Sequence, residues 1–123
     1  DSNSKKITKS IEIIYGLRNF IGNANKYSKS KIYISLKSDN EFSEIIIEDD
    51  GEGYPNDIIS KIGEPYLKTM SQNNKTMSGL GLGIFIGKTL LEKNFASINC
   101  RNSITRRGAE VRIKWKNKDL FKI

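Results

Sequence analysis

The chain has 123 residues, a formal net charge of +7, 37% hydrophobic residues and 28% charged residues. This length suits one domain, residues 1–123, and no apolar run reaches the roughly eighteen residues that a membrane span needs. The lysines are scattered, so we attribute the charge to a solvated surface rather than to a nucleic-acid site. Histidine is absent, so an imidazole would have to come from another segment or chain.

The first predicted elements are a helix and a hairpin. The helix spans Ile7–Tyr27, because its apolar residues recur with the spacing of one helical face. "KIYISLKS" (31–38) and "FSEIIIEDD" (42–50) are typical of two antiparallel strands, joined by a turn at "DNE".

The second half is predicted to contain two helices separated by a loop, followed by two strands. "PNDIISKI" (55–62) predicts a short helix, the polar stretch 63–78 a long flexible loop, and 80–95 an apolar helix. Two strands, 96–102 and 109–115, follow around a turn at "RRG". The expected fold class is α+β, a two-layer sandwich in which three helices cover one face of a mixed, mainly antiparallel sheet.

"DDGEGYP" (49–55) follows the buried-looking strand. Gly51 and Gly53 let the backbone turn sharply and approach a flat ligand closely. Asp49 ends the strand, where a fixed carboxylate could accept from an exocyclic amine such as that of adenine. A plain turn with a solvated pair of acids is an equally good interpretation of the spacing.

"SGLGLGIFIGKTLLEK" (78–93) is the second glycine cluster. Gly79, Gly81 and Gly83 alternate with leucines before the apolar helix. Glycines at a helix start free backbone N–H groups to point at an anion, which favours a polyphosphate site over a merely flexible entry.

The first helix carries two asparagines four residues apart. Asn19, Asn23, Lys26 and Tyr27 are expected on one stripe, away from the core stripe. An amide oxygen can ligate Mg²⁺, so Asn23 is the candidate ligand, with Lys26 a charge for phosphate and Tyr27 a lid. Alone, such a pair more often marks a solvated face.

Together these motifs resemble the ATP-binding domain of histidine kinases, in the superfamily shared with gyrase, Hsp90 and MutL. "LRNFIGNANKYS" is similar to its N box, "DDGEGYP" to the G1 box, "GEPYLKT" to the F box and "SGLGLGIFIG" to the G2 box. The resemblance covers about residues 7–116. "GEPYLKT" and "GLGIFIGKTLLEK" resemble more narrowly the RegB/PrrB type of redox-responsive sensor kinase.

The resemblance implies a role for each matching residue. Asn23 would coordinate Mg²⁺, Asn19 and Lys26 would contact phosphate, and Asp49 would bind the adenine amine. Residues 66–78 would form a lid over ATP, from which Lys68 could reach the phosphates. The remaining implied nucleotide-binding residues are Tyr27, Gly51, Gly53, Ser78, Gly79, Leu80, Gly81, Leu82 and Gly83.

ATPase branches of the superfamily carry a glutamate where this chain has Asn19, and an amide cannot take a proton from water. The resemblance therefore implies a domain that holds Mg·ATP for a histidine on a separate dimerisation domain of a longer sensor kinase. A cognate response regulator and a parent protein in the bacterial inner membrane, with this domain in the cytoplasm, are further implications.

Three positions depart from the family pattern. Gly63 replaces a bulky aromatic of the F box, Ala109 replaces a small hydroxyl residue, and Cys100 lies far from the place of the regulatory cysteine. Cys100 is expected to be a small buried hydrophobe rather than a redox switch. A stand-alone serine kinase of the anti-sigma type, a degenerate nucleotide-sensing module and a nucleic-acid binder stay open as alternatives.

Overall fold

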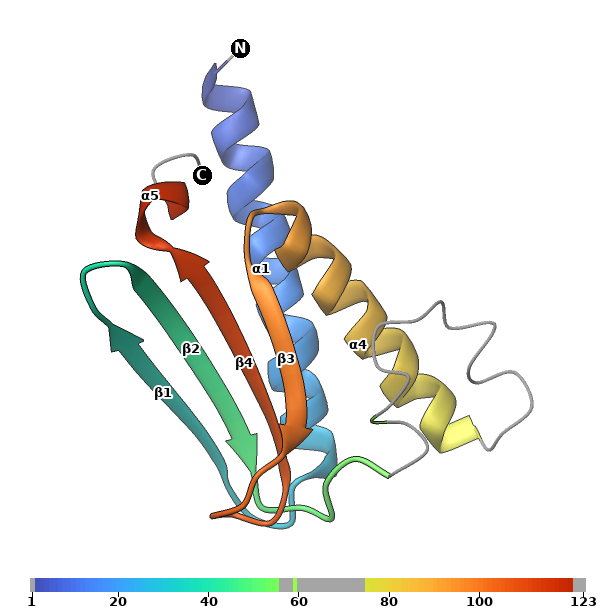
Figure 1. Cartoon of the computed structure of the whole chain (residues 1–123). Coiled ribbons are helices and arrows are strands. Elements are labelled where there is room, and N and C mark those ends of the chain that lie inside the picture. The colour runs from blue at the N-terminus through green and yellow to red at the C-terminus, as the bar shows by residue number, and fades with distance from the viewer. Residues whose placement is uncertain (1, 56–58, 60–74, 121–123) are drawn as a thin grey trace.

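The computed structural model describes residues 2–55, 59 and 75–120. Figure 1 shows two layers, a twisted antiparallel sheet and two long helices side by side on one of its faces. The sheet has four strands in the order β1-β2-β4-β3, and the two central strands lie over the helices. In chain order the elements are α1 (Ser2–Tyr27), β1 (Ile32–Ser38), β2 (Phe42–Asp49), α4 (Lys75–Lys93), β3 (Ser97–Asn102), β4 (Ala109–Lys116) and α5 (Asn117–Leu120).

The predicted fold class is confirmed, and the four predicted strands end within one residue of the observed ones. All described strand pairs are antiparallel, where a mixed sheet was expected. Asp39 closes the first hairpin by accepting the backbone N–H groups of Glu41 and Phe42, both at 2.8 Å. The predicted helix at 55–62 and the first part of the predicted loop lie almost entirely outside the described residues.

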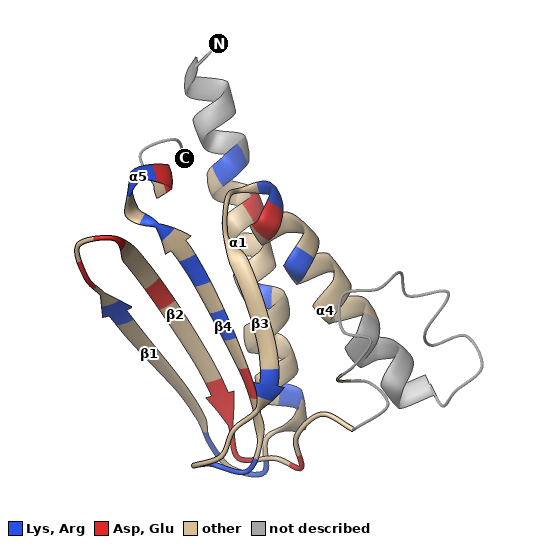
Figure 2. Ribbon diagram, viewed as in Figure 1, with Lys and Arg blue, Asp and Glu red and all other residues tan. Residues whose placement is uncertain are grey.

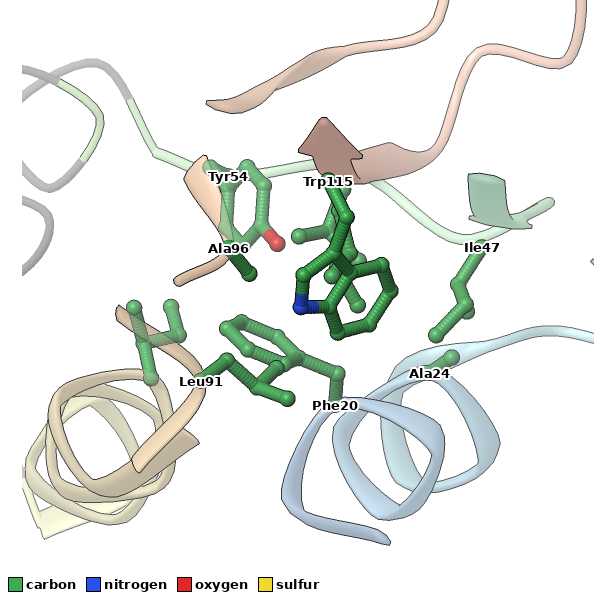
Figure 3. Packing of buried hydrophobic residues seen from close by; sticks show 10 residues of the cluster. Phe20, Ala24, Ile47, Tyr54, Leu91, Ala96 and Trp115 are labelled. Carbon is green, nitrogen blue, oxygen red and sulfur yellow. The ribbon is translucent and has the colours of Figure 1, made fainter. Parts of the chain in front are cut away.

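The core lies between the sheet and the two helices. Phe20 and Ala24 of α1 meet Leu91 of α4, while Ile47 and Trp115 come from the sheet (Figure 3). Pairing of β2 with β4 places apolar residues opposite one another, with Ile45 beside Ile113 and Ile47 beside Val111. Burial of these large side chains, at roughly 1.5–3 kcal/mol each, is the main stabilising contribution.

The opposite face of the sheet is charged. Acidic residues of β2 lie next to basic residues of β4 (Figure 2). Arg112 reaches Glu44 at 3.6 Å and Glu110 at 2.8 Å. The face towards the helices is therefore apolar and the other polar, as expected for strands with period-2 alternation.

The start of α4 corrects the sequence-based prediction. The helix begins at Lys75 rather than Leu80 and ends at Lys93, just before Phe95 takes a φ of 75°. Gly79, Gly81 and Gly83 therefore lie inside the helix and not in a turn before it. No membrane-length apolar helix is found in the described part of the chain.

Close packing of α4 against α1 explains why glycines are accepted in a helix. A Cβ on Gly87 would lie 2.7 Å from the Phe20 ring and 3.2 Å from the Gly16 carbonyl oxygen. A Cβ on Gly83 would lie 2.9 Å from both terminal atoms of the Asn23 side chain. Glycine lowers helix propensity by roughly 1 kcal/mol, but here it lets two backbones approach.

We expect Gly87→Ala to lower the free energy of unfolding by about 1–3 kcal/mol, because the methyl group overpacks the helix contact. Gly22→Ala in α1 is the matched control, since its Cβ would meet nothing within 4 Å. That control should raise stability by about 0.5–1 kcal/mol through helix propensity. Denaturant unfolding measures both, and stabilisation by Gly87→Ala would contradict the close contact.

Candidate functional site

A cavity of about 340 Å³ opens where the C-terminal half of α1 meets the end of β2 and the start of β4. Its walls are mostly apolar, and the polar side chains that line it include one amide, one ammonium and two carboxylates. The lining residues are Phe20, Asn23, Ala24, Tyr27, Lys29, Ile47, Asp49, Glu52, Gly53, Tyr54, Pro55, Ala109 and Val111. A mostly apolar cavity with a few polar groups suits a small organic ligand.

Asp49 supplies the buried carboxylate and is only 3% exposed. Its Oδ1 accepts the backbone N–H of Gly51 at 2.9 Å and that of Ala109 at 3.2 Å. Burying a carboxylate requires such donors. Both of these backbone donors use Oδ1.

Two glycines hold the backbone against this carboxylate. A Cβ on Gly51 would collide with the Tyr27 carbonyl oxygen, and one on Gly108 would collide with Asp49 itself. Gly53 has a φ of +82°, a conformation that a side chain disfavours. The predicted sharp turn at Gly51 and Gly53 is therefore present, while a close approach to a flat ligand stays a prediction.

Asn23 lies across the cavity from the strands. Its Nδ2 is buried without a hydrogen-bond partner among the described residues. The side chain lies between the cavity and Gly83 of α4. An unsatisfied buried polar group costs about 1–3 kcal/mol, so this amide is available for a ligand at the expense of stability.

The other predicted residues of α1 do not all join Asn23. The Asn19 amide donates back to the Tyr15 carbonyl at 2.8 Å, and Lys26 is exposed with its ammonium 5.4 Å from the centre of the Tyr27 ring. Only Asn23 and Tyr27 of the predicted stripe line the cavity. The prediction that this stripe lies away from the core is wrong, because Asn23 is about 60° around the helix from Phe20.

The second glycine cluster reaches the site through α4. Gly83 contacts Asn23, and Leu82 is 42% exposed. For Ser78, Gly79, Leu80 and Gly81 the structure describes only a helical backbone. Lys68 and the predicted F box lie outside the described residues.

The sequence-based analysis missed several residues that shape the cavity. Tyr54 forms a wall and is 8% exposed, and Gly108 packs on Asp49. The predicted turn at "RRG" could have pointed to Gly108. The structure has a tight turn there, in which Arg107 takes a φ of 66°. Tyr54 gave no comparable signal.

Comparison with known families identifies the chain. The family model "Histidine kinase-, DNA gyrase B-, and HSP90-like ATPase" matches residues 8–119. The chain belongs to this family. The match includes every described residue that lines the cavity.

Individual relatives agree with this assignment. The chain is 39% identical over 108 residues to the sensor histidine kinase RegB of Cereibacter sphaeroides, covering 84% of this chain and 23% of that protein. It thus spans about a quarter of that relative's length. The fold matches the mycobacterial sensor histidine kinase MprB, with a TM-score of 0.61 at 21% identity over 83% of this chain and 70% of that one. It also matches ShkA in complex with AMPPNP, with a TM-score of 0.64 at 21% identity over 85% of this chain and 21% of that one.

Asp50, next to the buried carboxylate of Asp49, accepts hydrogen bonds from the residues that follow α1. Its Oδ1 accepts the backbone N–H groups of Lys29 and Ser30 at 2.9 and 3.0 Å, and its Oδ2 accepts the Ser30 hydroxyl at 2.5 Å. These hydrogen bonds, that of the Ser30 hydroxyl first, hold the pKa of Asp50 well below its usual 3.8. A carboxyl whose pKa is lowered by folding stabilises the fold above its unfolded pKa and loses that contribution as the pH falls.

We therefore expect the stability difference between wild type and Asp50→Asn to be largest near neutral pH and to narrow between about pH 5 and pH 2. Thermal unfolding followed across this range measures it. Exposed Glu41 provides the control, and Glu41→Gln should follow the wild-type pH dependence. A constant difference between wild type and Asp50→Asn would contradict the role of the ionised carboxylate.

Proposed function

We propose that this chain binds Mg·ATP in the cavity and donates the γ-phosphate to a histidine on a separate phosphoacceptor domain. The observation that carries the proposal is the pairing of two polar groups across one apolar cavity. Asp49 offers a carboxylate oxygen at one side, and Asn23 offers a buried amide without a partner among the described residues. Family membership supports a nucleotide as the ligand.

The base end of the ligand fits the strand side of the cavity. Ile47, Val111 and Ala109 present apolar surface there, and Asp49 can accept from an exocyclic amine. Adenine offers that amine where guanine offers a carbonyl oxygen. With guanine, the Asp49 carboxylate would face a carbonyl oxygen, and two acceptors would lack a donor. The cavity should therefore bind adenine more tightly than guanine.

The phosphate end fits Asn23. A flip of the Asn23 side-chain amide exchanges its donor and acceptor atoms. The same position can therefore present Nδ2 to a phosphate oxygen or Oδ1 to a cation. Asn23 would hold Mg²⁺, which on a nucleotide needs only one or two protein oxygens and neutralises phosphate charge. Lys26, Asn19 and Lys68 stay candidate phosphate contacts, since α1 places the first two within one turn of Asn23.

Transfer to a histidine rather than to water agrees with two features of the chain. Asn19 carries an amide that cannot accept a proton and is already donating to Tyr15. The chain contains no histidine, so a histidine acceptor has to be supplied by another segment or protein. The relatives named above are sensor histidine kinases, which supports a parent protein with a phosphoacceptor domain, a response regulator as partner and a membrane location.

Asn23→Ala should abolish the Mg²⁺-dependent part of ATP binding, weakening affinity at least about tenfold, because a hydrogen bond or ligand to a charged group is lost. The same change should leave the unfolding temperature equal or higher, because it removes an unsatisfied buried amide. Calorimetry with and without Mg²⁺ measures the first effect. Asn25→Ala, on the exposed side of α1, is the control, and equal affinities for both variants would refute the role of Asn23.

The phosphotransfer step has its own experiment. The chain is mixed with the helical phosphoacceptor domain of its parent kinase and ATP labelled on the γ-phosphate. We expect acid-labile label on that domain, lost when its histidine is replaced by glutamine and reduced by Asn23→Ala. Release of labelled phosphate into water without label on the acceptor would instead indicate an ATPase.

A further inference from the structure

Tyr54 lines the cavity but is not one of the predicted site residues. It follows Gly53 in the segment between β2 and the undescribed residues, and its ring is buried in the core cluster (Figure 3). It lines the same cavity as Asp49, so a ligand that fills this cavity can contact Tyr54.

Asn102 at the end of β3 holds the backbone of Tyr54 at two points. The Tyr54 N–H donates to Asn102 Oδ1 at 2.7 Å, and Asn102 Nδ2 donates to the Tyr54 carbonyl at 3.1 Å. One side chain thus satisfies both polar groups of one residue, 48 positions away in the sequence. The paired hydrogen bonds fix the two peptide units on either side of the Tyr54 Cα atom.

The fit around this contact is tight. A Cβ on Gly53 would lie 2.7 Å from Asn102 Oδ1, so the asparagine packs directly beneath the glycine with positive φ. Asn102 does not itself line the cavity. Its side chain reaches the cavity wall through Gly53 and Tyr54.

Cys100 lies two residues earlier on the same face of β3 and packs against the core cluster that contains Tyr54. Burial raises the pKa of the Cys100 thiol to about 12, so the thiol stays protonated and unreactive. Strand β3 therefore holds the backbone of Tyr54 through Asn102 and borders the core in which its ring is buried.

We propose that Asn102 is a positioning residue for nucleotide binding, which sets the base end of the cavity by fixing the backbone of Tyr54. The inference rests on the proposed function, because it takes ATP as the ligand. It adds a residue outside the motifs that carry the family resemblance. Its physical basis is preorganisation, since a wall already held in place need not be ordered when the ligand binds.

The test compares Asn102→Ala, Asn102→Asp and the control Asn99→Ala, which alters an exposed asparagine on the same strand. Affinities for ATP and for adenosine are measured by calorimetry at a temperature where circular dichroism shows every variant fully folded. Asn102→Ala should weaken both ligands about tenfold, because two hydrogen bonds that order the wall are lost. Asn102→Asp keeps the acceptor for the Tyr54 N–H and should weaken them about two- to fivefold.

The pattern of losses separates positioning from a merely structural role. A positioning role predicts equal fold-losses for ATP and adenosine, and Mg²⁺ dependence like that of wild type. Lower unfolding temperature with wild-type affinity in both Asn102 variants would overturn the inference. If Asn102→Ala does not fold, Asn102→Asp decides alone. Failure of the wild-type chain to bind ATP would instead overturn the proposed function.

Discussion

The buried carboxylate of Asp49 is the constraint around which the site is built. A carboxylate that is 3% exposed has to be met by donors, and two backbone N–H groups from separate segments meet it. That requirement brings the end of β2, the turn at Gly51 and the start of β4 to one point. It also forces close backbone contacts, so Gly51 and Gly108 cannot carry a Cβ. The cavity lies where these segments converge beside the C-terminal half of α1, whose last residue, Tyr27, packs its carbonyl group against Gly51.

The second constraint is the helix contact that places Asn23. Gly83 and Gly87 of α4 remove the side chains that would otherwise separate α4 from α1. The narrow gap leaves Asn23 facing both the cavity and α4, with an amide that finds no partner among the described residues. The free energy lost there is offset by the apolar contacts of Phe20 and Leu91 a turn or more away.

The strands and the class of fold could be predicted from the sequence because they follow from local periodicity. Alternation in 109–116 predicts one apolar and one polar face, the isoleucine run in 42–49 predicts a buried strand, and register then places Ile47 opposite Val111. Asp49, Gly51 and Gly53 could also be predicted, since one short segment contains the whole turn. The start of α4 could not, because glycine has low helix propensity and the reason for accepting it is a contact with another helix. For the same reason the sequence placed Gly83 near the start of the helix, whereas it lies more than two turns inside α4, against Asn23.

Contacts between a side chain and backbone groups far away in the sequence are the hardest to predict from the sequence. Asn102 is an exposed asparagine at a strand end, and although the alternation of β3 places it on the face opposite Asn99, nothing in the sequence near it indicates its partner. Its importance appears only when Tyr54, 48 residues earlier, is seen to offer both polar groups to it. Asp49 is held by backbone donors from two segments, and Tyr54 is held by Asn102, so hydrogen bonds fix two separate parts of the cavity wall. If the proposed ligand binds there, such a wall favours ligands that match its shape, because moving it would break these hydrogen bonds.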